Sequence, residues 1–210
     1  TSGTSTEGTD YATVSDITIS AGSTIGTATF TPTDDSIYEG DETAIIAIST
    51  VSGGSATESG TQTTAITITE NELAPTVSLS SSASSFDEDG SAITLTANLS
   101  VATTADVIVT FSTSGTATEG TDYANISNIT ISAGSTSGTT SLTPTNDSTY
   151  EGDETAIIAI DSVSGGSATE RGTQSVTLIL SEDDNPPTVT LSSSASSIAE
   201  NAGSSLTLTA

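Results

Sequence analysis

The side chains of this sequence that could do chemistry are its carboxylates. The 210-residue chain holds 27 Asp and Glu but only one Lys or Arg, and it contains no His and no Cys. The acids stand in short clusters beside short apolar runs. In the middle of the chain these clusters are residues 87–89, Asp122, Asp147, residues 151–154 and residues 182–184. Nearer the start they are Asp10 and residues 34–35, 39–42 and 70–72.

Carboxylates gathered in such numbers need a cation, because like charges in one site repel each other or force protonation. All the available ligands are oxygens, and without His or Cys the sequence offers little to zinc or copper. Calcium takes about 6–8 oxygen ligands in a flexible cage, whereas magnesium prefers to keep its waters. The clusters therefore predict Ca²⁺ sites.

A solvated acidic surface is the simpler interpretation of a charge run. Here the acids recur at matched loop positions, and this recurrence favours binding sites over a diffuse surface charge. Two known calcium motifs are missing, namely the helix–loop–helix calcium loop and the glycine-rich nonapeptide array.

The charge balance also excludes several classes of function. A net charge of -26 excludes a nucleic-acid binder, which needs a basic face, and it disfavours an anionic membrane surface. No serine nucleophile has a histidine partner. Glycoside hydrolysis needs one carboxyl group with a raised pKa, whereas calcium ligands are held ionised. We therefore expect no enzymatic activity.

An internal repeat organises the chain. The segment SGTSTEGTDYA at Ser2 returns as SGTATEGTDYA at Ser114, and YEGDETAIIAI occurs at both Tyr38 and Tyr150. Each pair is separated by 112 residues, a length that suits an immunoglobulin-sized sandwich of about 100 residues. Prolines that follow an acidic cluster mark the junctions. The predicted domains are the rear of one repeat (residues 1–73), a complete repeat (74–185) and the first two strands of a following repeat (186–210).

Short alternations of Val, Ile, Leu and Thr between turn residues predict strands, and no stretch has a helical period. The complete repeat holds seven of them, at residues 76–80, 92–99, 107–112, 128–132, 139–143, 155–163 and 175–180. The predicted fold is all-β, with tandem immunoglobulin-like antiparallel β-sandwiches of about seven strands each. Four tyrosines beside the acidic clusters are expected in the core, namely Tyr11, Tyr38, Tyr123 and Tyr150.

Three motifs in this order, SGTATEGTDYA, NDSTYEGDET and SEDDNPP, resemble the Calx-beta domain repeats of bacterial surface and adhesin-type proteins. The resemblance covers the whole chain and implies calcium binding at one end of each sandwich. In the complete repeat it implies the ligands Glu88, Asp122, Asp147, Glu151, Glu154, Glu182, Asp183 and Asp184. In the leading repeat it implies Asp10, Asp34, Asp35, Glu39, Glu42, Glu70 and Glu72, and Glu200 matches the position of Glu88 in the third repeat.

The two repeats differ at two implied ligands. Asn146 stands where the leading repeat has Asp34, and Asn71 stands where the complete repeat has Asp183. Each difference removes one charge, so the two sites are expected to differ in affinity or in ion number.

The leading functional hypothesis is a calcium-binding structural repeat of a secreted or cell-surface adhesin, stalk or filament that calcium stiffens at domain junctions. The alternative is a calcium-sensing regulatory domain or a ligand-binding adhesive domain. The expected partners are neighbouring repeats, or copies of the chain end to end, with no nucleic acid and no membrane insertion. We expect the strand pair that carries Glu200 to complete a sandwich with a segment like residues 1–73.

Overall fold

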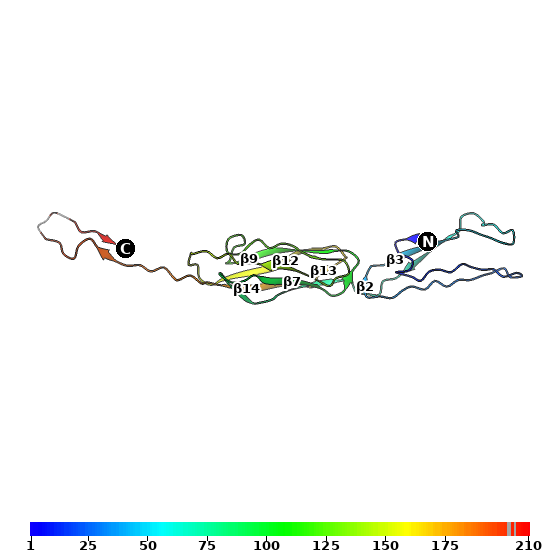
Figure 1. Cartoon of the computed structure of the whole chain (residues 1–210), viewed down its shortest axis with the longest axis horizontal. Helices are drawn as coiled ribbons and strands as arrows, with labels where there is room; N and C mark the ends of the chain where they lie inside the picture. Colours follow the sequence, from blue (N-terminus) through cyan, green and yellow to red (C-terminus); the bar gives the residue numbers. More distant parts are fainter. Residues whose placement is uncertain (201–202, 204) are drawn as a thin grey trace.

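The structure is a computed structural model that describes residues 1–200, 203 and 205–210. Every regular element of these residues is a strand, which confirms the predicted all-β class. Within the described residues, no helix is long and apolar enough to cross a membrane. Three parts follow one another along the molecule, with the leading repeat at one end, the sandwich in the middle and the tail at the other end (Figure 1).

The complete repeat folds as a sandwich of two sheets. The larger sheet has the strand order β10-β9-β12-β14-β6, and its strands are Ile129–Ile131, Val107–Gly115, Glu154–Ser164, Ser175–Ser181 and Ser85–Asp87. The smaller sheet has the order β11-β7-β5-β13, with strands Ser137–Leu142, Ile93–Leu99, Thr76–Ser81 and Thr169–Glu170. All seven predicted strands are present to within three residues at each end.

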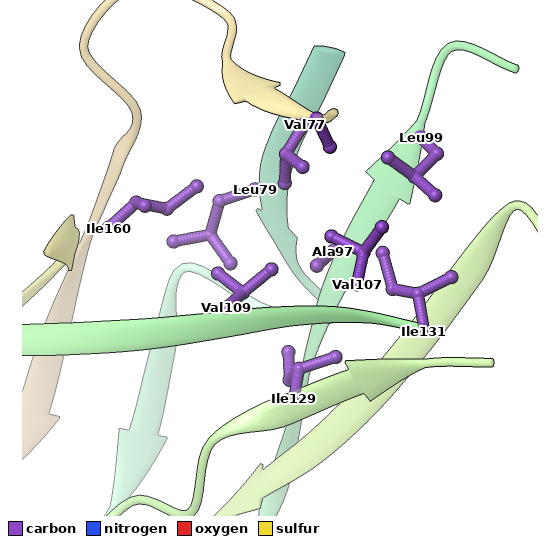
Figure 2. Packing of buried hydrophobic residues seen from close by; sticks show 10 residues of the cluster. Val77, Leu79, Ala97, Leu99, Val107, Val109, Ile129, Ile131 and Ile160 are labelled. Carbon is purple, nitrogen blue, oxygen red and sulfur yellow. The ribbon is translucent and has the colours of Figure 1, made fainter. Parts of the chain in front are cut away.

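Alternation along the strands builds the core between the sheets. In β7 the side chains of Ile93, Leu95, Ala97 and Leu99 are buried, while the residues between them are exposed or half-buried. This period of two places one side of each strand in the core and one in water. Figure 2 shows how apolar side chains from both sheets, such as Leu79, Ala97, Val107 and Ile129, meet at one end of the sandwich.

A second apolar cluster fills the other end, where the acidic loops gather. It joins Phe86, Leu95, Leu142, Leu178 and Tyr123, whose side chain is 0% exposed. Tyr11 is also buried in the leading repeat, so the prediction of core tyrosines holds for both TDY motifs. It is wrong for Tyr150, which is 46% exposed, because this residue lies in the loop before β12 and outside both sheets.

The first strand of the sandwich serves both sheets. β5 pairs with β7, and after a bend β6 pairs in parallel with the last strand, β14. β6 was not predicted because it contains a single apolar residue, Phe86, and the strands β8 (Ala102–Thr103) and β13 were not predicted because each has only two residues.

The leading repeat contains a three-stranded sheet of β1 (Ser2–Gly3), β3 (Glu42–Ala47) and β4 (Thr63–Ile68). Its apolar face is open. Ile17 and Ile19 are 59% and 58% exposed, whereas their counterparts in the complete repeat, Ile129 and Ile131, are fully buried. The counterparts are covered because β5 and β7 complete the core over them.

The tail forms a small hairpin of β15 (Ser192–Ser193) and β16 (Leu208–Thr209), which pair with each other. Its apolar side chains are exposed, for example Val189 at 82% and Leu191 at 73%. Among the described residues this hairpin does not pair with residues 1–73, and its predicted pairing with a segment of that kind stays a prediction.

One strand pair connects the leading repeat with the complete repeat. β2 (Ile37–Tyr38) runs parallel to β8, with Ile37 opposite Ala102 and Tyr38 opposite Thr103. Figure 1 shows β2 beside the near end of the sandwich.

Burial along β14 predicts how core truncations affect stability. We expect Leu178→Ala to lower the free energy of unfolding by about 3 kcal/mol, because it leaves a cavity between the sheets. Ile179→Ala is the matched control, since its side chain is 47% exposed and its loss should cost less than about 1 kcal/mol. Urea unfolding followed by circular dichroism measures both variants. Equal losses would contradict the assignment of the core face.

Candidate metal centres

Two groups of three carboxylates lie at matched positions of the two repeats. Asp122, Glu151 and Glu154 form one in the complete repeat, with one oxygen from each side chain within 4.8 Å of the others. The residues 112 positions earlier, Asp10, Glu39 and Glu42, form the same cluster in the leading repeat. The two repeats therefore build the same site twice.

Asp122 is positioned by a turn at the end of β9. Gly115 ends this strand with φ +118°, and a Cβ atom there would lie 2.1 Å from the carbonyl oxygen of Thr155, so only glycine fits. The turn that follows closes on Asp122, whose Oδ2 accepts a hydrogen bond from Thr118 N at 2.6 Å. Buried Tyr123 comes next and anchors the turn in the core. The sequence SGTATEGTDY thus places one oxygen-bearing side chain at the end of the sandwich.

Glu151 and Glu154 come from the segment that enters β12. Glu154 is the first residue of that strand, and Glu151 lies in the loop before it, in residues 150–153, which we call the YEGD loop. The two sides of the cluster are joined at the strand pair between β9 and β12, where Ala156 lies opposite Gly115. The carboxylates therefore approach each other because neighbouring strands start and end together.

Glu182 ties the YEGD loop to the segment that leaves the sandwich. Its Oε2 accepts hydrogen bonds from Glu151 N at 2.5 Å and Gly152 N at 2.8 Å. Its Oε1 accepts hydrogen bonds from Asp183 N and Asp184 N. In the leading repeat Glu70 makes the same contacts with Glu39 N, Gly40 N, Asn71 N and Glu72 N. We call this arrangement the carboxylate bridge.

A third cluster lies beside the bridge in the complete repeat and joins Glu88, Glu182 and Asp183. Glu88 is only 7% exposed, and its Oε1 accepts a hydrogen bond from Asp147 N at 3.0 Å. The described part of the leading repeat has no equivalent cluster. There Asn71 replaces the aspartate, and its amide donates a hydrogen bond to Asp34 Oδ1.

Mutual repulsion shows in the protonation of these carboxyl groups. Burial, followed by the charge of Asp10, raises the pKa of Glu42 to about 7. Burial and the charge of Asp122 raise the pKa of Glu154 in the same way, and Asp122 is the main cause that raises the pKa of Glu151. Without a cation to compensate the charge, Glu42 would therefore be partly protonated near neutral pH.

The bridging glutamates behave in the opposite way. Glu182 accepts backbone N–H groups, first that of Glu151, and these lower its pKa to about 2. Burial raises the pKa of Glu70, but the hydrogen bonds it accepts outweigh this effect and bring its pKa to about 2 as well. The bridges are thus ionised at every physiological pH, because four N–H donors stabilise each charge.

The residues fit a hard cation. Glu154 Oε2 and Asp184 Oδ2 are buried oxygens that have no hydrogen-bond partner within the described part of the chain. An unpaired buried oxygen costs free energy, which coordination to an ion would recover. The leading cluster opens into a pocket of about 40 Å³, lined by the carboxylates of Asp10, Asp35, Glu39, Glu42, Glu70 and Glu72. This all-oxygen set suits Ca²⁺.

The structure brings most of the implied ligands together. Nine of them belong to the three clusters, namely Asp10, Glu39, Glu42, Glu88, Asp122, Glu151, Glu154, Glu182 and Asp183. Asp35, Glu70 and Glu72 line the leading pocket, and Asp34, Asp147 and Asp184 lie in the adjoining loops. Glu200 is exposed and belongs to none of the clusters. That all these residues bind an ion stays a prediction.

Two further aspartates, not predicted as site residues, support the carboxylate bridges. Asp153 Oδ1 accepts a hydrogen bond from Glu182 N at 3.1 Å, and Asp41 Oδ1 accepts one from Glu70 N at 2.9 Å. These aspartates orient the bridge and lie in no cluster of potential ligands. The signal was the recurrence of the whole EGDE sequence in both repeats, which marks Asp41 and Asp153 as much as the glutamates.

A substitution within one cluster tests whether it is a site. We expect Glu151→Gln to weaken calcium binding at that cluster at least about tenfold, or about 1.4 kcal/mol, because one of its three charges is removed. Asp161→Asn is the control, since Asp161 is exposed on β12 outside the clusters. Calorimetric titration would then show one weakened class of sites in the first variant only. Equal effects of both substitutions would indicate a diffuse surface charge.

The raised pKa values predict how the stability of the folded chain depends on pH when a chelator has removed calcium. Glu42 has a pKa of about 7 in the folded chain against 4.5 ordinarily, so its contribution to stability is full below pH 4.5 and lost as the pH rises through 7. The stabilisation from the lowered pKa values of Glu70 and Glu182 is full above pH 4.5 and is lost only as the pH falls towards about 2, so it does not differ between pH 5 and pH 8. The metal-free protein should therefore unfold at higher urea concentration at pH 5 than at pH 8. A metal-free protein that is more stable at pH 8 would contradict this assignment.

One protein family matches this sequence over most of its length. The family model described as "Calx-beta domain" matches residues 1–72 and 70–185. No curated protein sequence matches the chain significantly. Similar solved structures include the "Apo-form Calx CBD1 domain", with 18% identity over 52% of this chain and 99% of that chain, and a TM-score of 0.43. "CBD12 from CALX1.2" matches with 17% identity over 50% of this chain and 45% of that chain, also with a TM-score of 0.43. Because the family model covers most of the sequence in two consecutive copies, the chain belongs to the Calx-beta domain family of calcium-binding, non-enzymatic domains.

Proposed function

We propose that this chain is a calcium-binding structural segment of a large extracellular adhesin, stalk or filament, in which Ca²⁺ stiffens the junctions between repeats. Membership of a calcium-binding domain family and the matched carboxylate clusters support calcium as the ligand. The structural role depends on how those clusters are connected to the linkers.

The observation that carries the proposal is the carboxylate bridge. In the leading repeat Glu70 holds the backbone of Glu39, a cluster residue, and it lies only six residues before β5 of the next repeat. An ion bound by Glu39 and Glu42 would fix residues 38–41, which correspond to the YEGD loop, and the bridge would transmit that order to the linker. The orientation of the next repeat would then depend on calcium.

The net charge of -26 gives calcium a further effect. Self-repulsion destabilises a compact chain, and the repulsion is strongest where the carboxylates lie closest. Cations bound at the clusters would lower this repulsion in the loops at the end of each sandwich. Calcium is therefore expected to stabilise the fold as well as the junctions.

Near-identity of the repeats favours a rod over a sensor or an adhesive tip. A tip or a sensor needs a surface that differs from its neighbours, whereas the YEGD loops and the TDY motifs are the same in both repeats. The calcium affinity separates the two classes, since extracellular modules bind with dissociation constants of about 10⁻⁴ to 10⁻³ M and sensors with about 10⁻⁷ to 10⁻⁵ M.

The proposed partners are neighbouring repeats, arranged end to end. The open face of the leading repeat contains a hollow of about 340 Å³ lined in part by Phe30, Ile66 and Ile68. Their counterparts in the complete repeat are Leu142, Leu178 and Leu180, which belong to one buried cluster with Ile93 and Leu95 of β7 and with Phe86 of β6. The tail carries the matching strand pair with exposed apolar side chains, so a segment of this kind fits the open face.

Removal of calcium tests the proposal directly. Calcium at one hundred times its dissociation constant should stabilise the native chain by about 2.7 kcal/mol for each independent site. We expect thermal unfolding in millimolar calcium to occur at a higher temperature than in chelator, with magnesium at equal ionic strength as the control. An unchanged midpoint would refute a structural role for calcium.

A further inference from the structure

The contact between the leading repeat and the complete repeat is made by backbone pairing. Ile37 lies opposite Ala102 and Tyr38 opposite Thr103, in parallel orientation. Among the described residues this is the one strand pair that joins the two repeats. It lies at the end of the complete repeat opposite the YEGD loop of that repeat, so each repeat presents two different ends to its neighbours.

The receiving strand, β8, is held firmly by its own repeat. Thr103 is 1% exposed, its hydroxyl donates to the carbonyl oxygen of Ala105 at 2.7 Å, and its carbonyl accepts from Gly134 N at 2.8 Å. Gly166 approaches it so closely that a Cβ atom there would lie 2.7 Å from Thr103 Oγ1. The position of this edge is therefore fixed by contacts within its own repeat.

The donating strand, β2, is held from both sides by carboxylates. Asp35 Oδ1 accepts a hydrogen bond from Ile37 N at 2.7 Å. Directly after Tyr38, the Glu70 bridge accepts the N–H groups of Glu39 and Gly40. These contacts fix an extended two-residue segment that points at the next repeat.

The complete repeat builds the same segment, and no strand among the described residues pairs with it. Asp147 Oδ1 accepts a hydrogen bond from Thr149 N at 2.6 Å, and Glu182 holds Glu151 N and Gly152 N. The geometry matches that around β2 in each of these contacts. Tyr150 is nevertheless 46% exposed, whereas its counterpart Tyr38 is half-buried beside β8.

We propose that residues 149–150 are a docking edge for a following copy of the repeat, paired with the residues of that copy that correspond to Ala102 and Thr103. The backbone contact explains why Ile37 and Thr149 can differ while their role is the same. The receiving residues carry no charge, so they do not repel the acidic loop that approaches them.

The partner is a repeat of the same chain because two residue pairs are too few to hold a free protein. A short covalent linker raises the effective concentration of the second surface to the millimolar range, where so small a contact can form. The inference goes beyond calcium binding, since no carboxylate belongs to the pairing itself. Failure of calcium to bind would therefore leave it standing.

Engineered disulfides test the docking edge, and no native thiol can compete with them because the chain has no cysteine. The first step uses the chain as it is, with Ile37→Cys and Ala102→Cys. Directly opposed residues of adjacent strands lie at a distance that a disulfide can span. Mild oxidation should join this pair within one molecule, as mass spectrometry of a non-reduced digest would detect.

The second step lengthens the chain by a copy of residues 98–185 after Ala210, which corresponds to Ala97. Thr149→Cys is combined with a cysteine at the position of Ala102 in the added copy. The control combines Thr149→Cys with a cysteine at the position of Thr145 in that copy. Thr145 is exposed and lies at the opposite end of the sandwich, where its N–H donates to Asp122 O.

If residues 149–150 are a docking edge, Thr149→Cys should form a disulfide at least about tenfold faster with the cysteine at the Ala102 position than with the cysteine at the Thr145 position. Equal rates in the lengthened chain would overturn the proposal even if Ile37→Cys and Ala102→Cys join, because the contact would then be peculiar to the first junction. Failure of Ile37→Cys and Ala102→Cys to join would overturn it as well, since the pattern on which it rests would be wrong.

Discussion

Repulsion between carboxylates is the constraint around which each repeat is built. Three of them have oxygens within 4.8 Å in each matched cluster, and Glu154 keeps one buried oxygen without a hydrogen-bond partner. Repulsion within such a cluster would push the loops apart when no cation is bound, unless other contacts hold their backbone in place. The carboxylate bridge provides such contacts. Both oxygens of Glu182 accept hydrogen bonds, four in all, from backbone N–H groups, and Glu182 is not a member of the cluster around Asp122.

Because of this constraint, the carboxylates of each repeat are of two kinds, which differ in the direction of their pKa shift. Glu70 and Glu182 have lowered pKa values because N–H donors surround them, whereas Glu42 and Glu154 have raised ones because burial and neighbouring charges dominate. Carboxylates of the first kind organise the loops through their hydrogen bonds, and those of the second kind carry the charge that a bound cation would neutralise. Among the described residues the third cluster is found in the complete repeat, where Glu88 and Asp183 stand beside Glu182.

Much of this arrangement was predictable from the sequence, for identifiable reasons. Alternating residues such as those of β7 mark long strands, and the period of 112 residues marks both the repeat and its acidic loops. Three features were not predictable. The strands β6, β8 and β13 are too short to show alternation, and backbone hydrogen bonds to Glu182 leave no pattern in the sequence. The exposure of Tyr150 depends on which loop meets the neighbouring repeat, and a local motif contains no such information.

The way the first strand is shared between the sheets decides how the sandwich bears tension. β6 and the last strand, β14, run parallel, with Ser85, Phe86 and Asp87 opposite Ile179, Leu180 and Ser181. A pull on the two ends of the repeat drags these strands past each other lengthwise, so their hydrogen bonds are loaded together in shear. In an antiparallel terminal pair the two pulled ends would lie at the same end of the pair, so the hydrogen bonds would break one after another. The bend that carries the chain from β5 to β6 thus gives the repeat the strand geometry of a load-bearing link.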